Sequence, residues 1–145
     1  MRRTWLYTIA EEGWRAVGGD RAARIGPLDV SGGQGYTATY MEAVFPPELY
    51  TPLIGHRHPG SEAWYLITGT QCLETPNGLI MASAGHAALV PEGWPMSISS
   101  VGPRTRRALV LILHRSDEPL AMPVHHRPKA GAPFADWKPK GLCPQ

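Results

Sequence analysis

Two histidines and one glutamate lie close together in the middle of the chain, at a spacing that suits metal binding. His56 and His58 are two residues apart, and Glu62 follows His58 by four. Because residues i and i+2 of an extended strand point to the same face, both imidazoles can be directed at one point. Pro59-Gly60-Ser61 is typical of a turn, which would fold the chain back and place Glu62 beside the pair. Two imidazoles and one carboxylate form the ligand set of a facial triad, which leaves metal positions open for substrate or oxygen.

This spacing resembles the first sequence motif of the cupin superfamily. From His56 to Gly69 the chain reads H-x-H-x-x-x-E-x-x-x-x-x-x-G, and Tyr50 stands where the motif has its opening glycine. The resemblance implies an all-β fold, the double-stranded β-helix or jelly-roll barrel. It also implies that His56, His58 and Glu62 are metal ligands inside that barrel.

The second cupin motif, G-x-x-x-x-x-P-x-G-x-x-H-x-x-x-N, is matched in part. Its two glycines and its proline are present as Gly85, Gly93 and Pro91, whereas Met96 stands at its histidine position and Ser100 at its asparagine position. A thioether is a soft donor, suited to Cu(I) and poor for Fe(II), Mn or Zn. We therefore expect Met96 to fill the space of the missing fourth ligand. Three protein ligands are still enough for a catalytic zinc or non-haem iron site.

The elements that position these residues are predicted to be short strands. The chain has 16 glycines and 15 prolines among 145 residues, which favours many turns. Strands are predicted at 36–45, 53–58, 62–68, 70–74, 78–82, 87–91, 96–100 and 108–113. Asn77-Gly78 predicts a hairpin. Residues 4–9 are predicted to form a first strand or an arm, and residues 22–25 are predicted to form a short strand. Many short strands indicate a sandwich or barrel, and the resemblance to cupins selects the jelly roll.

We expect one cupin domain over residues 1–116, including the N-terminal strands, with a barrel core at about 36–114. Six prolines interrupt residues 117–145. This segment is predicted to be an extended tail that packs on the barrel or on a partner subunit, or else a loosely ordered terminus. Because a small barrel of this kind leaves sheet edges exposed, and because the N-terminal strand and the tail can cover them across a two-fold axis, a homodimer is expected.

Strand alternation predicts which side chains line the pocket beside the histidines. If Glu62 points into the barrel, Trp64 and Leu66 do so too, and they would form an apolar, aromatic wall. On the next strand either Gln71 and Leu73 or Cys72 and Glu74 point inward, and the pattern fits both sets equally. The simplest alternative for His56 and His58 is that they are polar residues at a barrel mouth. His86 is expected in a surface turn, and no role is assigned to His114, His125 or His126.

Charge and cysteine content narrow the classes of partner and compartment. The formal net charge is +2, and the short basic run at residues 104–107 is expected in a solvated loop, which argues against nucleic acid as a partner. Cys72 and Cys143 lie far apart and form no disulfide framework, so a reducing, cytoplasmic compartment is the simpler interpretation, unless a leader peptide has been removed. No stretch approaches the length of a membrane span.

Two functional hypotheses follow. The first is a metal-dependent small-molecule enzyme, such as the dioxygenases and isomerases that the cupin resemblance implies, with His58 and Glu62 as catalytic residues. Its cofactor would be a divalent Fe, Mn, Zn or Ni ion, or none, in which case His58 would act as a base. The second is a non-catalytic module that binds a sugar or an organic acid without metal. No nucleophile elbow, phosphate-binding loop or dinucleotide pattern is present.

Overall fold

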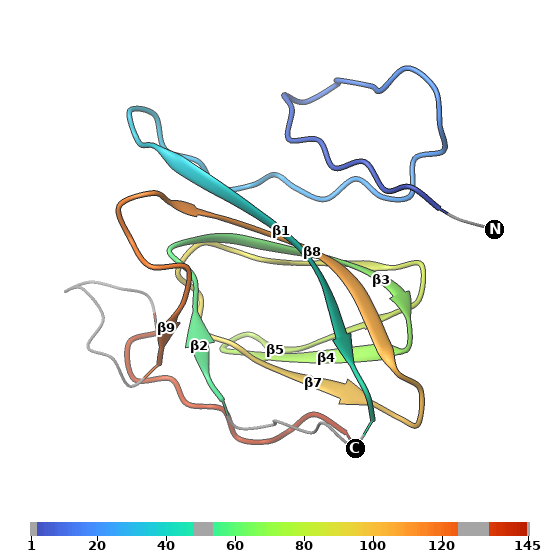
Figure 1. Cartoon of the computed structure of the whole chain (residues 1–145). Helices are drawn as coiled ribbons and strands as arrows, with labels where there is room; N and C mark the ends of the chain where they lie inside the picture. Colours follow the sequence, from blue (N-terminus) through green and yellow to red (C-terminus); the bar gives the residue numbers. More distant parts are fainter. Residues whose placement is uncertain (1–2, 48–53, 125–133, 145) are drawn as a thin grey trace.

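The computed structural model describes residues 3–47, 54–124 and 134–144, and within these ranges the chain forms nine strands and no helix (Figure 1). The strands are β1 (Tyr36–Phe45), β2 (His56–Arg57), β3 (Gly60–Thr68), β4 (Thr70–Thr75), β5 (Gly78–Ser83), β6 (Ala87–Val90), β7 (Ser97–Val101), β8 (Arg106–Arg115) and β9 (Met122–Pro123). All eight strands predicted between residues 36 and 113 form, with ends that differ by a few residues. No helix in the described ranges is long and apolar enough to cross a membrane.

Two antiparallel sheets face each other. The first has the strand order β1-β8-β3-β6 and the second the order β5-β4-β7. A backbone bridge between His56 and Met96 attaches β2 beside the start of β7, and β2 also pairs with β9. After each strand the chain crosses to the other sheet, except at the β4–β5 hairpin, where Thr75 pairs with Gly78. This winding of antiparallel strands into two facing sheets is the jelly roll that the sequence predicted.

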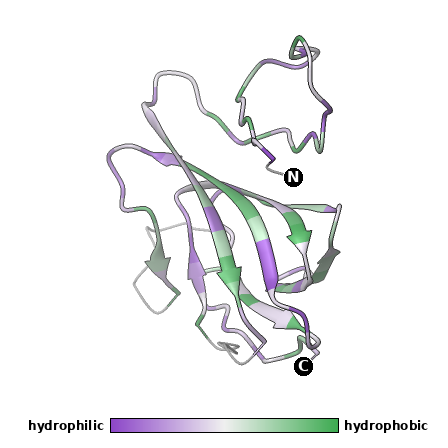
Figure 2. Cartoon of the chain, turned by 45° about the vertical axis from the view of Figure 1, so that its right-hand side comes forward, coloured by the Kyte–Doolittle hydropathy of each residue, from purple (hydrophilic) through white to green (hydrophobic). Residues whose placement is uncertain are grey.

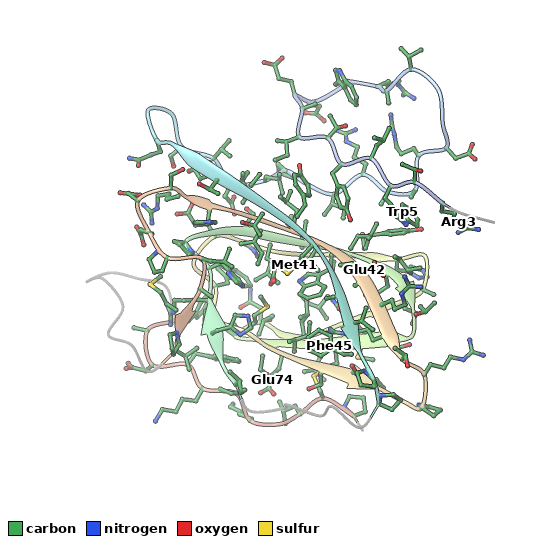
Figure 3. The ribbon with its side chains drawn as sticks, in the orientation of Figure 1. Arg3, Trp5, Met41, Glu42, Phe45 and Glu74 are labelled. Atoms are coloured by element: carbon green, nitrogen blue, oxygen red, sulfur yellow. A yellow bond between two sulfur atoms is a disulfide. The ribbon has the colours of Figure 1, made fainter. Side chains whose placement is uncertain are left out.

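The core lies between the two sheets and follows the alternation of the strands. Trp64 and Leu66 of β3 face Val110 and Ala108 of β8 across the first sheet, and Leu73 of β4 closes the core from the second sheet. These side chains are all buried, because alternate residues of each strand point to the same face. Figure 3 shows side chains from both sheets filling the space between them.

Gly60 and Gly69 allow the backbone of the motif to approach the backbone of β8 closely. A Cβ on Gly60 would lie 1.8 Å from the carbonyl oxygen of Leu113, so only glycine fits beside β8 at the start of β3. Gly69 has a φ of +73°, and a Cβ there would lie 2.8 Å from the Cα of Arg106. A side chain at either position would push β3 away from β8. The glycine that closes the cupin-like motif is thus required by a close backbone approach.

The short strand predicted at residues 22–25 does not form, and of the two alternatives for residues 4–9, a first strand or an arm, the structure has the arm. Residues 3–35 contain no strand, and Gly13, Gly18-Gly19 and Gly26-Pro27 interrupt any extended run. The segment instead stands beside the first sheet as an arm and returns to β1 (Figure 1). The Trp5 and Tyr7 rings of the arm lie 5.9 Å from Tyr65 and 4.6 Å from Tyr40, between ring centroids, and the Asp29 backbone N–H donates to Ser61 Oγ.

The C-terminal segment crosses the outer face of the second sheet and is joined to it by a disulfide. Cys72 of β4 is bonded to Cys143. Beside this bond the backbone N–H groups of Lys140, Gly141 and Leu142 donate to the Glu74 carboxylate. The interpretation of the cysteines as two separate thiols is therefore wrong, and the case for a reducing compartment falls with it. Sequence distance misled because residues 71 apart along the chain meet in the fold.

Candidate metal centre

The three residues singled out from their spacing converge inside the barrel. His56 lies in β2, His58 just after it and Glu62 in β3, and one potential ligand atom from each lies within 4.8 Å of the other two. His58 Nε2 is 3.5 Å from Glu62 Oε1, and the two imidazoles meet edge to face with centroids 5.1 Å apart. The turn at Pro59-Gly60 makes this possible, since it brings the chain from β2 into β3 within two residues.

A backbone carbonyl lies beside the Nδ1 atom of each imidazole, and in His58 this nitrogen is opposite the one near Glu62. The Nδ1 atom of His58 is 2.6 Å from the carbonyl oxygen of Leu120, and that of His56 is 3.4 Å from the carbonyl oxygen of Ile54. With Nδ1 as the donor, Nε2 carries the free lone pair. Histidines that bind metals commonly donate their other ring N–H to a carbonyl in this way. Nothing in the sequence marks Leu120 for this role, because its contribution comes from its backbone.

Burial controls the charges of the trio. Burial lowers the pKa of His58 to about 4, against the opposing effect of the Leu120 carbonyl, and His56 and His114 lower it further. Burial raises the pKa of Glu62 to about 8, although the Trp64 indole and the Arg106 guanidinium favour the charged carboxylate. At neutral pH the metal-free site therefore holds neutral imidazoles beside a largely protonated carboxyl group.

Two polar atoms of the trio are buried without a hydrogen-bond partner among the described residues. They are His58 Nε2 and Glu62 Oε2. Such atoms are costly unless something satisfies them. A divalent cation would do so, because an imidazole nitrogen and a carboxylate oxygen are suitable ligands for Zn and Fe. The residues present therefore fit a divalent metal.

Met96 occupies the position that the sequence motif assigns to a fourth ligand. Its backbone pairs with that of His56 in both directions, at 2.9 Å and 2.8 Å. Side chains of such a cross-strand pair lie on the same face of the sheet. Met96 is completely buried and packs in the apolar core with Trp64 and Ile112.

Of the two alternate sets on β4, the one with Gln71 and Leu73 points into the barrel. Gln71 Oε1 accepts a hydrogen bond of 3.0 Å from Arg106 Nη1, and Leu73 belongs to the core, so this set points inward. Cys72 and Glu74 point to the outer face, where the C-terminal segment covers them. The remaining expected lining residues, Trp64 and Leu66, are buried in the core.

Arg106 belongs to the basic run at residues 104–107, but its side chain lies in the interior of the barrel. Arg104, Thr105 and Arg107 are exposed as expected, but Arg106 is 1% exposed, which corrects the assignment of the whole run to a solvated loop. Its guanidinium carbon lies 4.1 Å from the centre of the Phe45 ring and 5.2 Å from that of Trp64. The signal was available in the alternation of β8, since inward residues at 112, 110 and 108 imply an inward residue at 106.

Of the other histidines, His86 is exposed in the turn before β6, as predicted. His114 is buried in β8, and its Nδ1 lies 2.9 Å from the carbonyl oxygen of Arg115. His125 and His126 lie outside the described residues.

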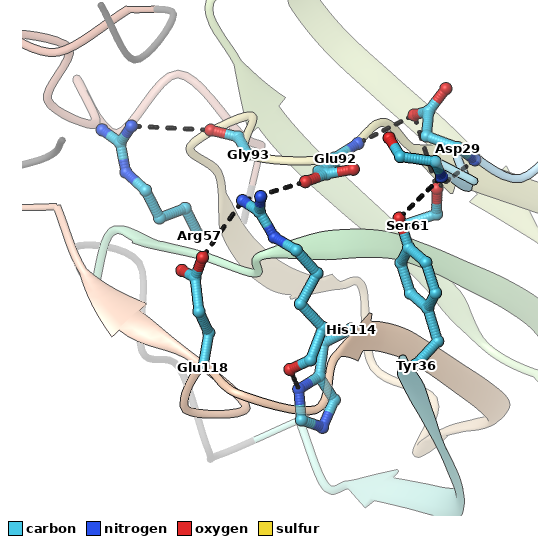
Figure 4. Close-up of polar contacts among 10 residues, drawn as sticks. Asp29, Tyr36, Arg57, Ser61, Glu92, Gly93, His114 and Glu118 are labelled. Atoms are coloured by element: carbon cyan, nitrogen blue, oxygen red, sulfur yellow. Dashed lines mark hydrogen bonds and ion pairs between the residues drawn. The ribbon is translucent and has the colours of Figure 1, made fainter. Parts of the chain in front are cut away.

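Polar contacts hold the loops around the β2–β3 corner (Figure 4). Arg115 forms ion pairs with Glu92 at 3.1 Å and Glu118 at 3.2 Å. Asp29 of the N-terminal arm accepts a hydrogen bond from the Glu92 backbone N–H, and the Asp29 backbone N–H donates to Ser61 Oγ. These contacts tie the loop before Met96, the arm and the segment after β8 to the corner that carries the histidines.

Comparison with known proteins supplies similarities of fold. No protein-family model matches the chain, and no curated protein matches it. Among solved structures, it is similar to an uncharacterised conserved protein with a double-stranded β-helix domain from Klebsiella pneumoniae, at 16% identity over 66% of this chain and 75% of that one, with a TM-score of 0.49. A cupin-2 domain containing protein from Shewanella frigidimarina is similar at 14% identity over 57% and 72%, with a TM-score of 0.36.

The DMSP lyase DddQ from Ruegeria pomeroyi is similar at 22% identity, with a TM-score of 0.49; the similarity covers 59% of this chain and 42% of that one. All three identities are low, so these similarities concern the fold alone.

Proposed function

We propose that this chain is a metal-dependent enzyme that acts on a small molecule, with a divalent ion held by His56, His58 and Glu62. The convergence of the three potential ligand atoms within 4.8 Å supports the proposal more than any other observation. The two unpartnered buried atoms, His58 Nε2 and Glu62 Oε2, support it independently. Iron, manganese, zinc and nickel are all compatible with two imidazoles and one carboxylate.

A divalent ion at this site would supply Lewis-acid polarisation of a bound oxygen atom of the substrate. The chain's own residues would prepare the site for it. The carbonyl groups of Leu120 and Ile54 hold the Nδ1 side of each imidazole, so that Nε2 faces inward. Glu62 loses its proton to become a ligand, and buried Met96 keeps water away from the side next to His56.

Without a metal, the same residues offer acid–base chemistry. His58 has a lone pair on Nε2, and Glu62 carries a proton at neutral pH, 3.5 Å away. This pair could take a proton from a substrate carbon and return it, as an isomerase requires. A binding module that performs no reaction is the remaining alternative.

The proposal is tested by the metal content of protein purified without added metal, and by calorimetric titration with Zn and Ni. We expect bound metal in the native protein and a loss of affinity in His56→Ala. His86→Ala is the matched control, because His86 is exposed in a turn and should leave affinity unchanged. If the native protein and His56→Ala bind these ions equally, the trio is not a metal site, and a tightly held organic ligand without metal would favour the binding module.

A further inference from the structure

A buried arginine faces the interior of the barrel and acts electrostatically on Glu62 of the trio. Arg106 is 1% exposed and is held between two aromatic rings, those of Phe45 and Trp64. Its guanidinium makes one hydrogen bond within the described part of the chain, to Gln71 Oε1 at 3.0 Å. A guanidinium has five N–H donors, so this single neutral acceptor leaves most of its capacity unused.

No carboxylate of the described residues lies within ion-pair distance of Arg106. Arg24, Arg107 and Arg115 form ion pairs with carboxylates, all at the surface or the rim. The other buried acid, Glu74, is held on the outer face by backbone N–H groups. Burial lowers the pKa of Arg106 to about 10, and the more distant Glu62 only partly opposes this. A buried charge without a close partner costs several kcal/mol, and a bound anion would offset this cost.

Buried hydrogen-bond donors without a partner occur on the guanidinium itself and on side chains linked to it. Arg106 Nε, Gln71 Nε2, Trp64 Nε1 and the Ser100 hydroxyl are all buried and have no hydrogen-bond partner within the described ranges. Gln71 pairs with Ser100 across β4 and β7, so their side chains lie on the same face. Together with Arg106 Nε, these three further donors form a site that needs an acceptor with more than one oxygen atom.

We propose that Arg106, Gln71 and Trp64 bind the carboxylate group of a small organic acid inside the barrel. A carboxylate suits this set, because its two oxygens accept the paired N–H groups of a guanidinium while the aromatic rings hold the guanidinium plane. Trp64 is two residues from Glu62 on the same face of β3. An acid held at Arg106 would therefore direct its other end toward the trio. This part of the inference rests on the proposed function, and it identifies the substrate class as small organic acids.

Calorimetric titration of the metal-free protein with malonate tests the carboxylate site apart from the metal. Malonamide, which has the same shape without the charge, is the control ligand. We expect malonate to bind and malonamide to bind far more weakly. Arg106→Gln should lower malonate affinity by about tenfold to hundredfold, the range expected for one lost charge-assisted hydrogen bond. Arg107→Gln is the matched control, because Arg107 is exposed and paired with Glu42, and it should bind malonate like the native protein.

A second variant tests the carboxylate site even if Arg106→Gln fails to fold. Gln71→Glu places a carboxylate 3.0 Å from Arg106, on the atom that now accepts its hydrogen bond. We expect this internal carboxylate to raise the melting temperature and to abolish malonate binding. Zinc titrations of the same variants separate the two proposals, since retained zinc affinity with lost malonate affinity supports the carboxylate site. Equal binding of malonate and malonamide, no binding of malonate by the native protein, or native malonate affinity in Gln71→Glu would overturn it.

Discussion

Glu62 is the residue whose charge must change when a metal binds. Burial raises its pKa to about 8, whereas the pKa of His58 is lowered to about 4. At neutral pH His58 is therefore uncharged in both the metal-free and the metal-bound protein. Glu62 gives up its proton as it becomes a ligand. We predict the release of about one proton per bound ion at neutral pH. Calorimetry in buffers of different ionisation enthalpy measures this number, and it should fall toward zero above the Glu62 pKa.

The same shifts predict how the stability of the metal-free protein depends on pH. Between 4.5 and about 8, Glu62 is protonated in the folded protein and ionised in the unfolded chain, so stability falls as the pH rises. His58 acts in the opposite direction between about 4 and 6.5, because its folded pKa is lowered. Burial also lowers the pKa of His56, so both histidines oppose the Glu62 effect below pH 6.5, and the Glu62 effect alone remains from there to about 8.

Over that upper window we predict a loss of about 2 kcal/mol in the free energy of unfolding. Glu62→Gln should remove this loss, because its carboxamide does not ionise. Urea unfolding at several pH values checks both proteins, and Glu92→Gln is a control at the half-buried rim. A native protein whose stability stays flat across the window would mean that Glu62 has no raised pKa.

Met96 tests whether the fourth position of the site is open to a better ligand. Because Met96 pairs with His56 and is fully buried in the core, Met96→His should place a third imidazole on the same face. Affinity for Zn and Ni should rise clearly, since imidazole is a better donor than a thioether, and His56→Ala in the same background should reverse the gain. A cost of about 1 kcal/mol to the metal-free protein is expected from the lost apolar packing. Equal or weaker binding by the variant would show that position 96 does not face the trio.

Residue types and spacing were sufficient to find the trio but not its surroundings. His56, His58 and Glu62 were predictable because alternation and one short turn bring them together locally. The Leu120 carbonyl that contacts His58 lies 62 residues away in the sequence. Because the contact uses the backbone, the identity of residue 120 does not predict it. Arg106 was hidden by its neighbours, since a run of basic residues is typical of a loop, and only the alternation of β8 separates it from Arg107.

At the scale of elements, local patterns predicted the strands well and the ends of the chain poorly. Strands between residues 36 and 113 have turn residues at both ends and apolar residues at alternate positions, and both signals are local. The N-terminal segment has aromatic residues of high β propensity, but none of its described residues joins a sheet, so it remains an arm. The course of the C-terminal segment depends on Glu74 and Cys72, which are distant in sequence, and no local pattern encodes that contact.

The disulfide gives the C-terminal segment a measurable role in stability. It closes a loop of 71 residues, for which loss of chain entropy in the unfolded state implies a stabilisation of about 4 kcal/mol at most. Cys143→Ser should therefore lower the free energy of unfolding by about 2–4 kcal/mol. Urea unfolding with and without a reductant checks this. The reductant should destabilise the native protein and leave Cys143→Ser unchanged, and an unaffected native protein would argue that the bond does not form in solution.

At the scale of the whole molecule, we propose that the chain is one domain with the C-terminal segment packed on its second sheet. The jelly roll leaves β1 at one edge of the first sheet. The arm beside it includes hydrophobic residues (Figure 2), and several of their side chains are exposed. Leu6 is 90% exposed, Trp14 is 52% exposed and Val17 is fully exposed. Apolar residues concentrated on one exposed segment are unfavourable in water and commonly mark an interaction surface.

We propose that a second copy of the chain covers this arm in a homodimer. A two-fold axis would let each arm cover the other's apolar residues, and a free edge strand favours such pairing. Light scattering should then give about twice the 15.8 kDa mass of one chain. Replacing Trp14 and Val17 together by serine should shift the protein toward monomer at low concentration, because both side chains lose apolar area available for burial. The matched control is Leu142→Ser, which changes an exposed apolar residue on the C-terminal segment, and this variant should stay dimeric.

A native protein that remains a monomer at high concentration would rule out this assembly. A dimer that persists in the double variant would place the interface elsewhere.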